Sequence, residues 1–283
     1  MSNTVSFRSS LFRPLAIAAL TLGLAAPVLA SEGAPHPHRE AWSFAGPFGK
    51  YDRAQLQRGF QVFKEVCTSC HSAHLFSFRN LAQPGGPEFS EAQAKVVAEG
   101  YQIQDGPNDA GDMFDRPGRL SDRWPSPFPN EQAARASNGG AFPPDFSTLA
   151  KARTYEVGFP GFLFDIVTQY QEQGPDYIHA LLNGYGEPPE GFALPEGAHY
   201  NKFFPGHAIK MPQPISDGQV TYTDGTPETL DQYSRDVTAF MMWVAEPHLE
   251  ARKRIGFQAM FFLIVFAGLL YFTKKKVWKG VGH

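Results

Sequence analysis

Residues Cys67-Thr68-Ser69-Cys70-His71 constrain the fold more than any other segment, because they indicate what the rest of the chain must surround. They read C-x-x-C-H, the attachment signature of a c-type haem. Two thiols at this spacing can add across the two vinyl groups of one porphyrin, and the histidine that follows can coordinate the iron from one face. The motif predicts one covalent haem held by Cys67 and Cys70, with His71 as an axial ligand.

Two other interpretations of C-x-x-C are weaker. A thioredoxin-like redox site needs a surrounding βαβ pattern, which the sequence lacks. A zinc site needs two more ligands, and although His74 could be one, both cysteines of the chain are already in the motif. Once the haem is attached, no cysteine remains for a structural disulfide, which excludes a disulfide-stapled secreted fold.

Composition narrows the class of protein. The chain has 283 residues, of which 19% are charged and 42% hydrophobic, so it is neither disordered nor fully embedded in a membrane. Its 27 Gly, 24 Pro and 25 Phe suggest a loop-rich fold packed around something large and flat.

Residues 1–30 are typical of a cleaved secretory signal. Arg8 and Arg13 form the positive region, residues 15–24 the apolar region, and residues 28–30 a small-residue cleavage site, which puts the mature start at Ser31. The alternative is an uncleaved anchor, but about ten apolar residues are too few to span a bilayer.

A second apolar segment, residues 255–272, has 18 residues without a charge. As a helix it would be about 27 Å long, close to the thickness of the hydrocarbon layer. Basic clusters flank it at 252–254 and 274–279, which argues against a buried core helix. The sequence predicts that residues 31–251 are exported and that residues 252–283 form a transmembrane anchor with a short cytoplasmic tail.

The exported part is acidic. Residues 31–251 hold 16 Lys and Arg against 28 Asp and Glu, a net charge of −12, whereas the whole chain has −3. Such a charge disfavours nucleic acid and attracts basic partners, although solubility alone is an alternative explanation.

Hydrophobic periodicity predicts five helices, at residues 52–66, 91–100, 162–170, 175–182 and 229–246. The first has Asp52 as N-cap and runs directly into the cysteine motif. Residues 83–146 are otherwise irregular, and Asp105, Asp109, Asp112 and Asp115 suggest a solvated acidic loop. Strand signals are few. The predicted fold is mainly α, with long loops around one haem.

A six-coordinate electron-transfer iron needs a second axial ligand. Two methionines lie outside the signal, the membrane segment and the helix that leads to it, namely Met113 in the acidic loop and Met211 in an apolar, proline-fixed loop. We choose Met211, while a histidine stays open as a competitor, from His179, His199 or His207. Arg153 is a candidate partner for a haem propionate.

Several segments together resemble the cytochrome c1 family, the haem subunits of the bacterial cytochrome bc1 complex, or ubiquinol–cytochrome c oxidoreductase. The resemblance covers nearly the whole mature chain and rests on FGKYDRAQLQRGFQVFKEVCTSCH, NGGAFPPDFSTLAKAR, PDYIHALLNGY, AIKMP, TYTDGTPET and VTAFMMWVAEPHLEARKRIGF, in the order of the family. Residues 83–137 and 154–174 match it weakly. Some bacterial relatives carry a disulfide near the methionine loop, for which this chain has no cysteines left, so packing and proline must steady that loop.

The resemblance implies that Cys67 and Cys70 bind haem c, that His71 and Met211 are its axial ligands, and that Arg153 contacts a propionate. It adds Pro143, Pro144 and Tyr177 as haem-pocket residues. The implied partners are a cytochrome b subunit, a Rieske iron–sulfur subunit as electron donor and a basic soluble cytochrome c as acceptor. The implied location is the bacterial inner membrane, with the haem domain in the periplasm.

The predicted activity is an electron relay that does no bond chemistry on a substrate and counts as an enzyme only as part of the complex. A haem enzyme such as a peroxidase would need a displaceable sixth ligand, which the Met211 loop disfavours. A stand-alone anchored shuttle is the third possibility, and co-purification with cytochrome b would exclude it.

Overall fold

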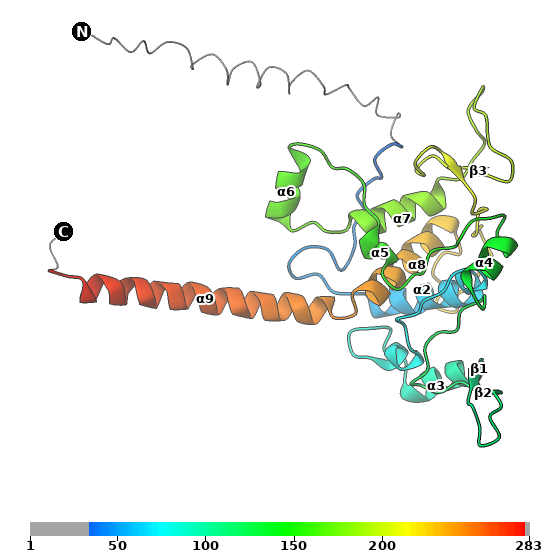
Figure 1. Cartoon of the computed structure of the whole chain (residues 1–283). Helices are drawn as coiled ribbons and strands as arrows, with labels where there is room; N and C mark the ends of the chain where they lie inside the picture. Colours follow the sequence, from blue (N-terminus) through cyan, green and yellow to red (C-terminus); the bar gives the residue numbers. More distant parts are fainter. Residues whose placement is uncertain (1–33, 281–283) are drawn as a thin grey trace, which may run out of the picture.

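Two helices pack side by side at the centre of the computed structural model, which describes residues 34–280 (Figure 1). Helix α2 (Arg53–Glu65) begins at Asp52, whose side chain accepts a hydrogen bond from the Gln55 amide at 3.1 Å. Helix α8 (Leu230–Ala245) begins at Thr229, which caps it through the Gln232 amide. Each cap satisfies an amide that has no partner within its own helix.

Gly59 lets the two helices approach closely. A Cβ atom at this position would lie 2.1 Å from the carbonyl oxygen of Asp236 and 2.8 Å from the Cβ of Phe240. A third helix, α7 (Gln173–Asn183), and the short α5 (Leu149–Ala152) pack against α8 as well. The four helices form the frame of the domain.

An aromatic core fills the space between this frame and the loops. Phe63 lies 5.3 Å from Phe240 and 5.2 Å from Trp124, measured between ring centroids, and Trp243 lies 5.6 Å from Phe240. These spacings suit the offset and edge-to-face contacts that aromatic rings prefer. Seven phenylalanines of the described residues are buried in this core.

The remaining elements are short and lie around the frame. A 3-10 turn, η1, covers Cys67–Ser69, and η2 covers Phe78–Ala82. The other helices are α3 (Glu91–Glu99), α4 (Glu131–Ser137) and α6 (Gly161–Thr168). Two antiparallel ribbons pair β1 (Gln102–Asp105) with β2 (Phe114–Pro117) and β3 (His199–Tyr200) with β4 (Ala208–Ile209).

The predicted mainly α fold is confirmed, and each of the five predicted helices is present. The stretch from 83 to 146 is more ordered than expected, because it also holds α4 and the β1–β2 hairpin. Asp105 belongs to β1 and pairs with Arg116 across the hairpin, so it is not part of a purely solvated loop. Asp109 and Asp112 are exposed at the tip, as predicted.

Helix α9 (Leu249–Val277) projects from the domain (Figure 1). Its 29 residues extend beyond the apolar stretch at both ends, so the expected boundary at residue 252 lies inside the helix. Its most apolar 18-residue window is 0% buried, which contradicts the alternative of a core helix. Among the described residues it is the one helix long and apolar enough to cross a membrane. The expected signal, residues 1–30, and the mature start at Ser31 lie outside the described residues.

Candidate haem site

The cysteine motif forms a tight turn at the end of α2. The amide of His71 donates to the carbonyl oxygen of Cys67 at 2.9 Å, which closes the turn. The two residues between the cysteines hold its start, since the Thr68 hydroxyl donates to the Lys64 carbonyl and the Ser69 hydroxyl to the Val66 carbonyl, each at 2.8 Å. These hydroxyls satisfy carbonyls that the helix end leaves without amide partners. The motif is therefore fixed relative to α2.

His71 is buried and its ring is oriented by one hydrogen bond. Nδ1 lies 2.8 Å from the carbonyl oxygen of Pro144. A carbonyl oxygen only accepts, so Nδ1 carries the proton and Nε2 keeps its lone pair. Burial lowers the pKa of His71, which favours the neutral ring that a metal ion requires. The ring also packs on Phe146, with centroids 4.4 Å apart.

Asp145 ties the segment that carries Pro144 to the motif. Its carboxylate accepts hydrogen bonds from the Ser72 hydroxyl at 2.7 Å, the His74 amide at 2.9 Å and the Ser147 amide at 2.8 Å. Burial alone would raise the pKa of Asp145, but the hydrogen bonds from Ser147, His74 and Ser72 outweigh it and hold this pKa well below its usual range. The carboxylate is therefore charged and keeps these donors together.

The geometry disfavours the two competing interpretations of C-x-x-C. Burial raises the pKa of the Cys67 thiol to about 12, whereas a thioredoxin-like site needs a lowered one. Within residues 34–280, no three side chains of His, Cys, Asp or Glu are grouped in a way that could hold a metal ion, so a zinc site built on His74 finds no support there. A histidine with a free Nε2 that directly follows two thiols remains; the nitrogen suits haem iron and the thiols suit the vinyl groups of the porphyrin.

Met211 follows β4 and borders the core while staying half-buried. Its carbonyl oxygen accepts a hydrogen bond from the Tyr185 hydroxyl at 3.1 Å. The preceding ribbon is held by the fully buried Asn201, whose side-chain amide donates to the Leu181 carbonyl at 2.8 Å. Hydrogen bonds from Asn201 and Tyr185 thus add to packing and proline in steadying this loop. Sequence reasoning missed both residues.

The competing axial ligands are less suitable. His179 is buried, but its Nδ1 lies 3.6 Å from Glu40 and its Nε2 3.0 Å from Asp231, so both ring nitrogens face carboxylates. His199 is exposed on β3, and His207 stacks on Tyr200 in the turn of the same ribbon. Met113 is 53% exposed, in the turn between β1 and β2. A half-buried thioether at the edge of the core suits a second iron ligand better than these side chains, so Met211 stays the predicted ligand.

Arg153 and Tyr177 belong to α5 and α7, which pack against each other. Arg153 is the exposed C-cap residue of α5, and Tyr177 is half-buried on α7 at the edge of the core. Burial raises the pKa of Tyr177, and the positive charge of Arg153 partly opposes this. A guanidinium at the edge of the hydrophobic core can pair with a carboxylate at the edge of a bound cofactor.

Pro143 lines a cavity of about 200 Å³ next to the motif. Cys70, Ser72, His74 and residues 126–131 also line this cavity. Pro143 therefore lies beside the motif. Pro144 contributes the carbonyl oxygen that accepts from His71.

Asp145 and Phe146 are two further site residues that sequence reasoning missed. An aspartate two residues before a serine is typical of a turn in which the side chain accepts from the backbone, and this signal could have singled out Asp145. Nothing local in the sequence marks Phe146 as the partner of the His71 ring.

The chain matches the Cytochrome C1 family over residues 42–281. It belongs to that family. A protein of Bradyrhizobium diazoefficiens named cytochrome b/c1 is 64% identical over 265 residues, which cover 93% of this chain and 39% of that protein. Cytochrome c1 of Blastochloris viridis is 54% identical, with 95% of this chain and 96% of the relative covered. Cytochrome c1 of Rhodospirillum rubrum is 44% identical, with 96% and 98% covered. The chain thus spans about two fifths of the first relative and nearly all of the other two.

Membership confirms the prediction of a haem-based electron-transport protein of the cytochrome bc1 complex, a membrane-bound component of a respiratory chain. Neutral His71 with a free Nε2, half-buried Met211 and the two thiols fit a haem.

Proposed function

We propose that the chain is the electron-transfer subunit of ubiquinol–cytochrome c oxidoreductase and passes electrons from a Rieske iron–sulfur subunit to a soluble cytochrome c. One haem c would be held covalently by Cys67 and Cys70, with His71 and Met211 as axial ligands. The observation that carries the proposal is the 2.8 Å contact from Nδ1 of His71 to the Pro144 carbonyl, which leaves Nε2 free beside the two thiols. Bound haem supplies a one-electron couple at its iron.

The residues of the chain would set the conditions for this couple. The Pro144 carbonyl holds His71 in one tautomer and makes the ring more electron-rich, and the thioether of Met211 favours the reduced iron and a raised potential. Arg153 would offset the charge of a propionate at the rim, near Tyr177. None of these side chains has to donate or accept a proton during transfer.

The partners follow from charge and from relatives. The net charge of −12 over residues 31–251 would attract a basic cytochrome c, with an association rate that falls as salt is added. A relative named cytochrome b/c1 supports a cytochrome b subunit as a partner. Helix α9 would anchor the chain in the bacterial inner membrane, with the domain in the periplasm and the last residues in the cytoplasm.

The test is a redox-titrated visible spectrum of membranes that contain the assembled complex. We expect a low-spin c-type spectrum with a methionine–iron band, and reduction by quinol that stops when the iron–sulfur subunit is removed. The Cys67→Ala, Cys70→Ala double variant should lose the haem that stays on the chain after denaturation. A high-spin spectrum would favour a haem enzyme instead, and quinol reduction without the iron–sulfur subunit would contradict the proposed donor.

A further inference from the structure

Helix α6 exposes an apolar surface with no exposed charge on the helix. Its outward side chains, with that of Phe159 just before it, are between 45% and 82% exposed and comprise Phe159, Phe162, Leu163, Phe164, Ile166 and Val167. Its one charged residue, Asp165, is buried and pairs with Arg39 at 2.6 Å and with the Gln173 amide at 3.0 Å. An exposed apolar cluster of this kind marks an interaction site.

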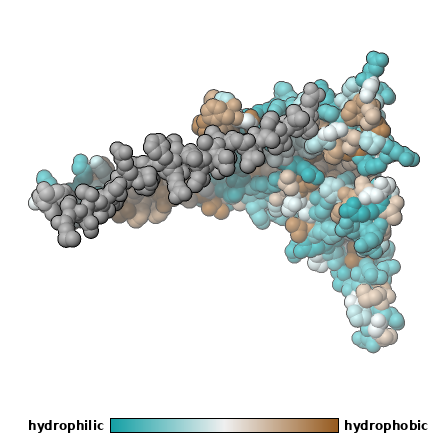
Figure 2. All heavy atoms as spheres, turned by 45° about the horizontal axis from the view of Figure 1, so that its top comes forward, coloured by the Kyte–Doolittle hydropathy of each residue, from teal (hydrophilic) through white to brown (hydrophobic). Residues whose placement is uncertain are grey.

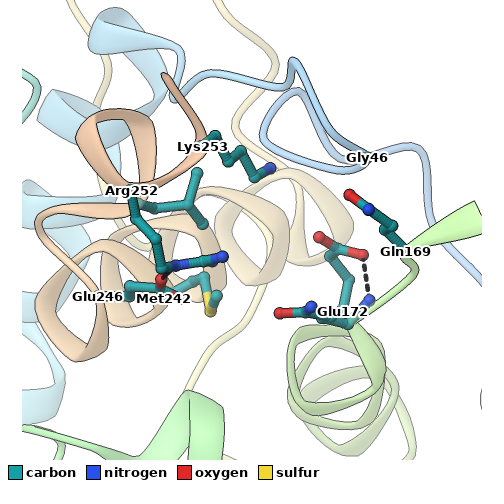
Figure 3. Close-up of a pocket in the computed structure, with 9 residues that line it drawn as sticks. Gly46, Gln169, Glu172, Met242, Glu246, Arg252 and Lys253 are labelled. Atoms are coloured by element: carbon teal, nitrogen blue, oxygen red, sulfur yellow. Dashed lines mark hydrogen bonds and ion pairs between the residues drawn. The ribbon is translucent and has the colours of Figure 1, made fainter. Parts of the chain in front are cut away.

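The position of α6 points to the membrane side of the domain. The segment that follows α6 lines a small cavity together with the start of α9. Gln169 and Glu172 of this segment face Arg252 and Lys253 across the cavity (Figure 3). In Figure 1, α6 lies on the side of the domain toward which α9 extends, level with the first turns of that helix. Figure 2 shows the same part of the molecule as a brown projection on the anchor side.

Another exposed aromatic residue, outside α6, contacts the beginning of the apolar stretch of α9. Phe48, which is 70% exposed, places its ring 5.5 Å from that of Phe257 on α9. Phe257 belongs to the apolar stretch that follows the basic residues 252–254. Phe48 is thus fixed at the depth where α9 turns from basic to apolar, which is the depth of a membrane interface.

We propose that α6 is an interfacial helix that inserts its apolar side chains into the headgroup and upper acyl region of the lipid bilayer beside α9. This inference rests on the proposed anchoring by α9. The exposed apolar side chains of α6 lie on more than one side of the helix, and the hydroxyl of Thr168 donates to the Phe164 carbonyl, which suits a medium that surrounds a helix. A protein groove would take a single apolar stripe. Near the start of α9, the exposed Arg254 suits anionic lipid headgroups, whereas Arg252 pairs with Glu246 and Lys253 donates to the Phe44 carbonyl.

The insertion would fix the domain at a second point. A single helix lets a domain rotate about the helix axis, whereas a second contact with the bilayer restricts that rotation. Asp165 links α6 to the domain through Arg39 and Gln173, so the tilt of the domain would follow the depth of α6.

The test is nitroxide labelling of the full chain, both alone in anionic phospholipid vesicles and in the assembled complex. The two cysteines of the chain are those of the haem motif, so Val167→Cys or Phe164→Cys gives this subunit one additional, labelled thiol. In the complex, the spectrum of the parent complex labelled in the same way is subtracted. Both sites are exposed, and an unchanged haem spectrum verifies the fold.

Two reference labels calibrate the result. Leu263→Cys on α9 reports lipid, and Met113→Cys in the β1–β2 turn reports water. We expect the labels at 167 and 164 to be several-fold more accessible to oxygen than to a water-soluble nickel complex, as at 263. Preference for nickel, as at 113, or shielding from both agents, which means a protein contact, would overturn the proposal. A label at 263 that behaves as in water would instead contradict anchoring by α9.

Discussion

Nδ1 of His71 lies 2.8 Å from the carbonyl oxygen of Pro144, a residue 73 positions away in the chain. This hydrogen bond selects the tautomer of the ring and aims Nε2 away from the protein backbone. The contact depends on the segment around Asp145, which the Ser72 hydroxyl and the His74 amide near the motif hold in place. The orientation of the proposed iron ligand is thus controlled from a distant part of the sequence.

Asp145→Ala should loosen this segment. The change leaves the Ser72 hydroxyl and the His74 and Ser147 amides without their acceptor, and we expect the free energy of unfolding to fall by about 3 kcal/mol. Chemical denaturation of the haem-bearing chain measures the loss. Asp109→Ala, at the exposed hairpin tip, is the matched control and should change stability by less than about 0.5 kcal/mol. Equal stability of the two variants would show that Asp145 does not hold the segment.

Met211→Leu should remove the second axial ligand while keeping the volume of the side chain. The midpoint potential of the haem should fall by on the order of 0.1 V or more, because the thioether that favours reduced iron is lost. A redox titration of the complex gives the value, and electron delivery to cytochrome c should stop. Met113→Leu, which alters the exposed methionine, should leave the potential unchanged. An unchanged potential in the first variant would move the ligand to another residue.

Gly59→Ala should separate α2 from α8. The added Cβ would lie 2.1 Å from the Asp236 carbonyl oxygen, a backbone atom that cannot turn away, so we expect a loss of about 3 kcal/mol or more. Thermal unfolding measures it. Gly186→Ala is the control, because nothing lies within 4 Å of the added atom. A Gly59 variant as stable as this control would show that the two helices can move apart at little cost.

The chain should lose stability in acid in part through Asp122. Two hydrogen bonds from Arg116, at 2.6 and 3.0 Å, hold the pKa of Asp122 below its ordinary value. The unfolded chain binds this proton more readily, so the stabilisation is fully present above about pH 4 and is lost as the pH falls through the lowered pKa. Urea unfolding at several pH values should show Asp122→Asn less stable than the parent near neutrality and equal to it at low pH. Asp109→Asn should follow the parent throughout, and a gap that is constant with pH would contradict the role of the charge.

Shortening the chain should show where the domain ends. Ending it after residue 254 keeps the buried Leu249 and the Glu250 carboxylate, which accepts from Arg53 at 2.7 Å and from the Tyr51 amide at 3.0 Å. We expect this form to be soluble and to carry haem. Ending the chain after residue 248 removes both groups and should cost about 3 kcal/mol. Haem staining of the soluble fraction and thermal unfolding compare the two forms, and equal stability would place the end of the domain before α9.

Sequence patterns predicted the elements better than their contacts. The helices at 52–66 and 229–246 follow from apolar spacing and from the caps Asp52 and Thr229, which are local signals. The β1–β2 hairpin was missed because its strands are four residues long and largely polar, so neither alternation nor β propensity marks them. In the proposed site, five consecutive residues reveal the cysteine motif. No local pattern reveals Asn201 and Tyr185, which hold the Met211 loop.

By itself the sequence determined the cysteine motif, the apolar segment at its C-terminal end, the mainly helical class and the resemblance to cytochrome c1, because each of these is written in neighbouring residues or in their periodicity. The tertiary structure was needed to show that the Pro144 carbonyl orients His71, that Asn201 and Tyr185 hold the Met211 loop, and that the segment after α6 lines a cavity with the start of α9. These contacts join residues far apart in the chain, and their geometry comes from packing around the aromatic core, which no local pattern encodes.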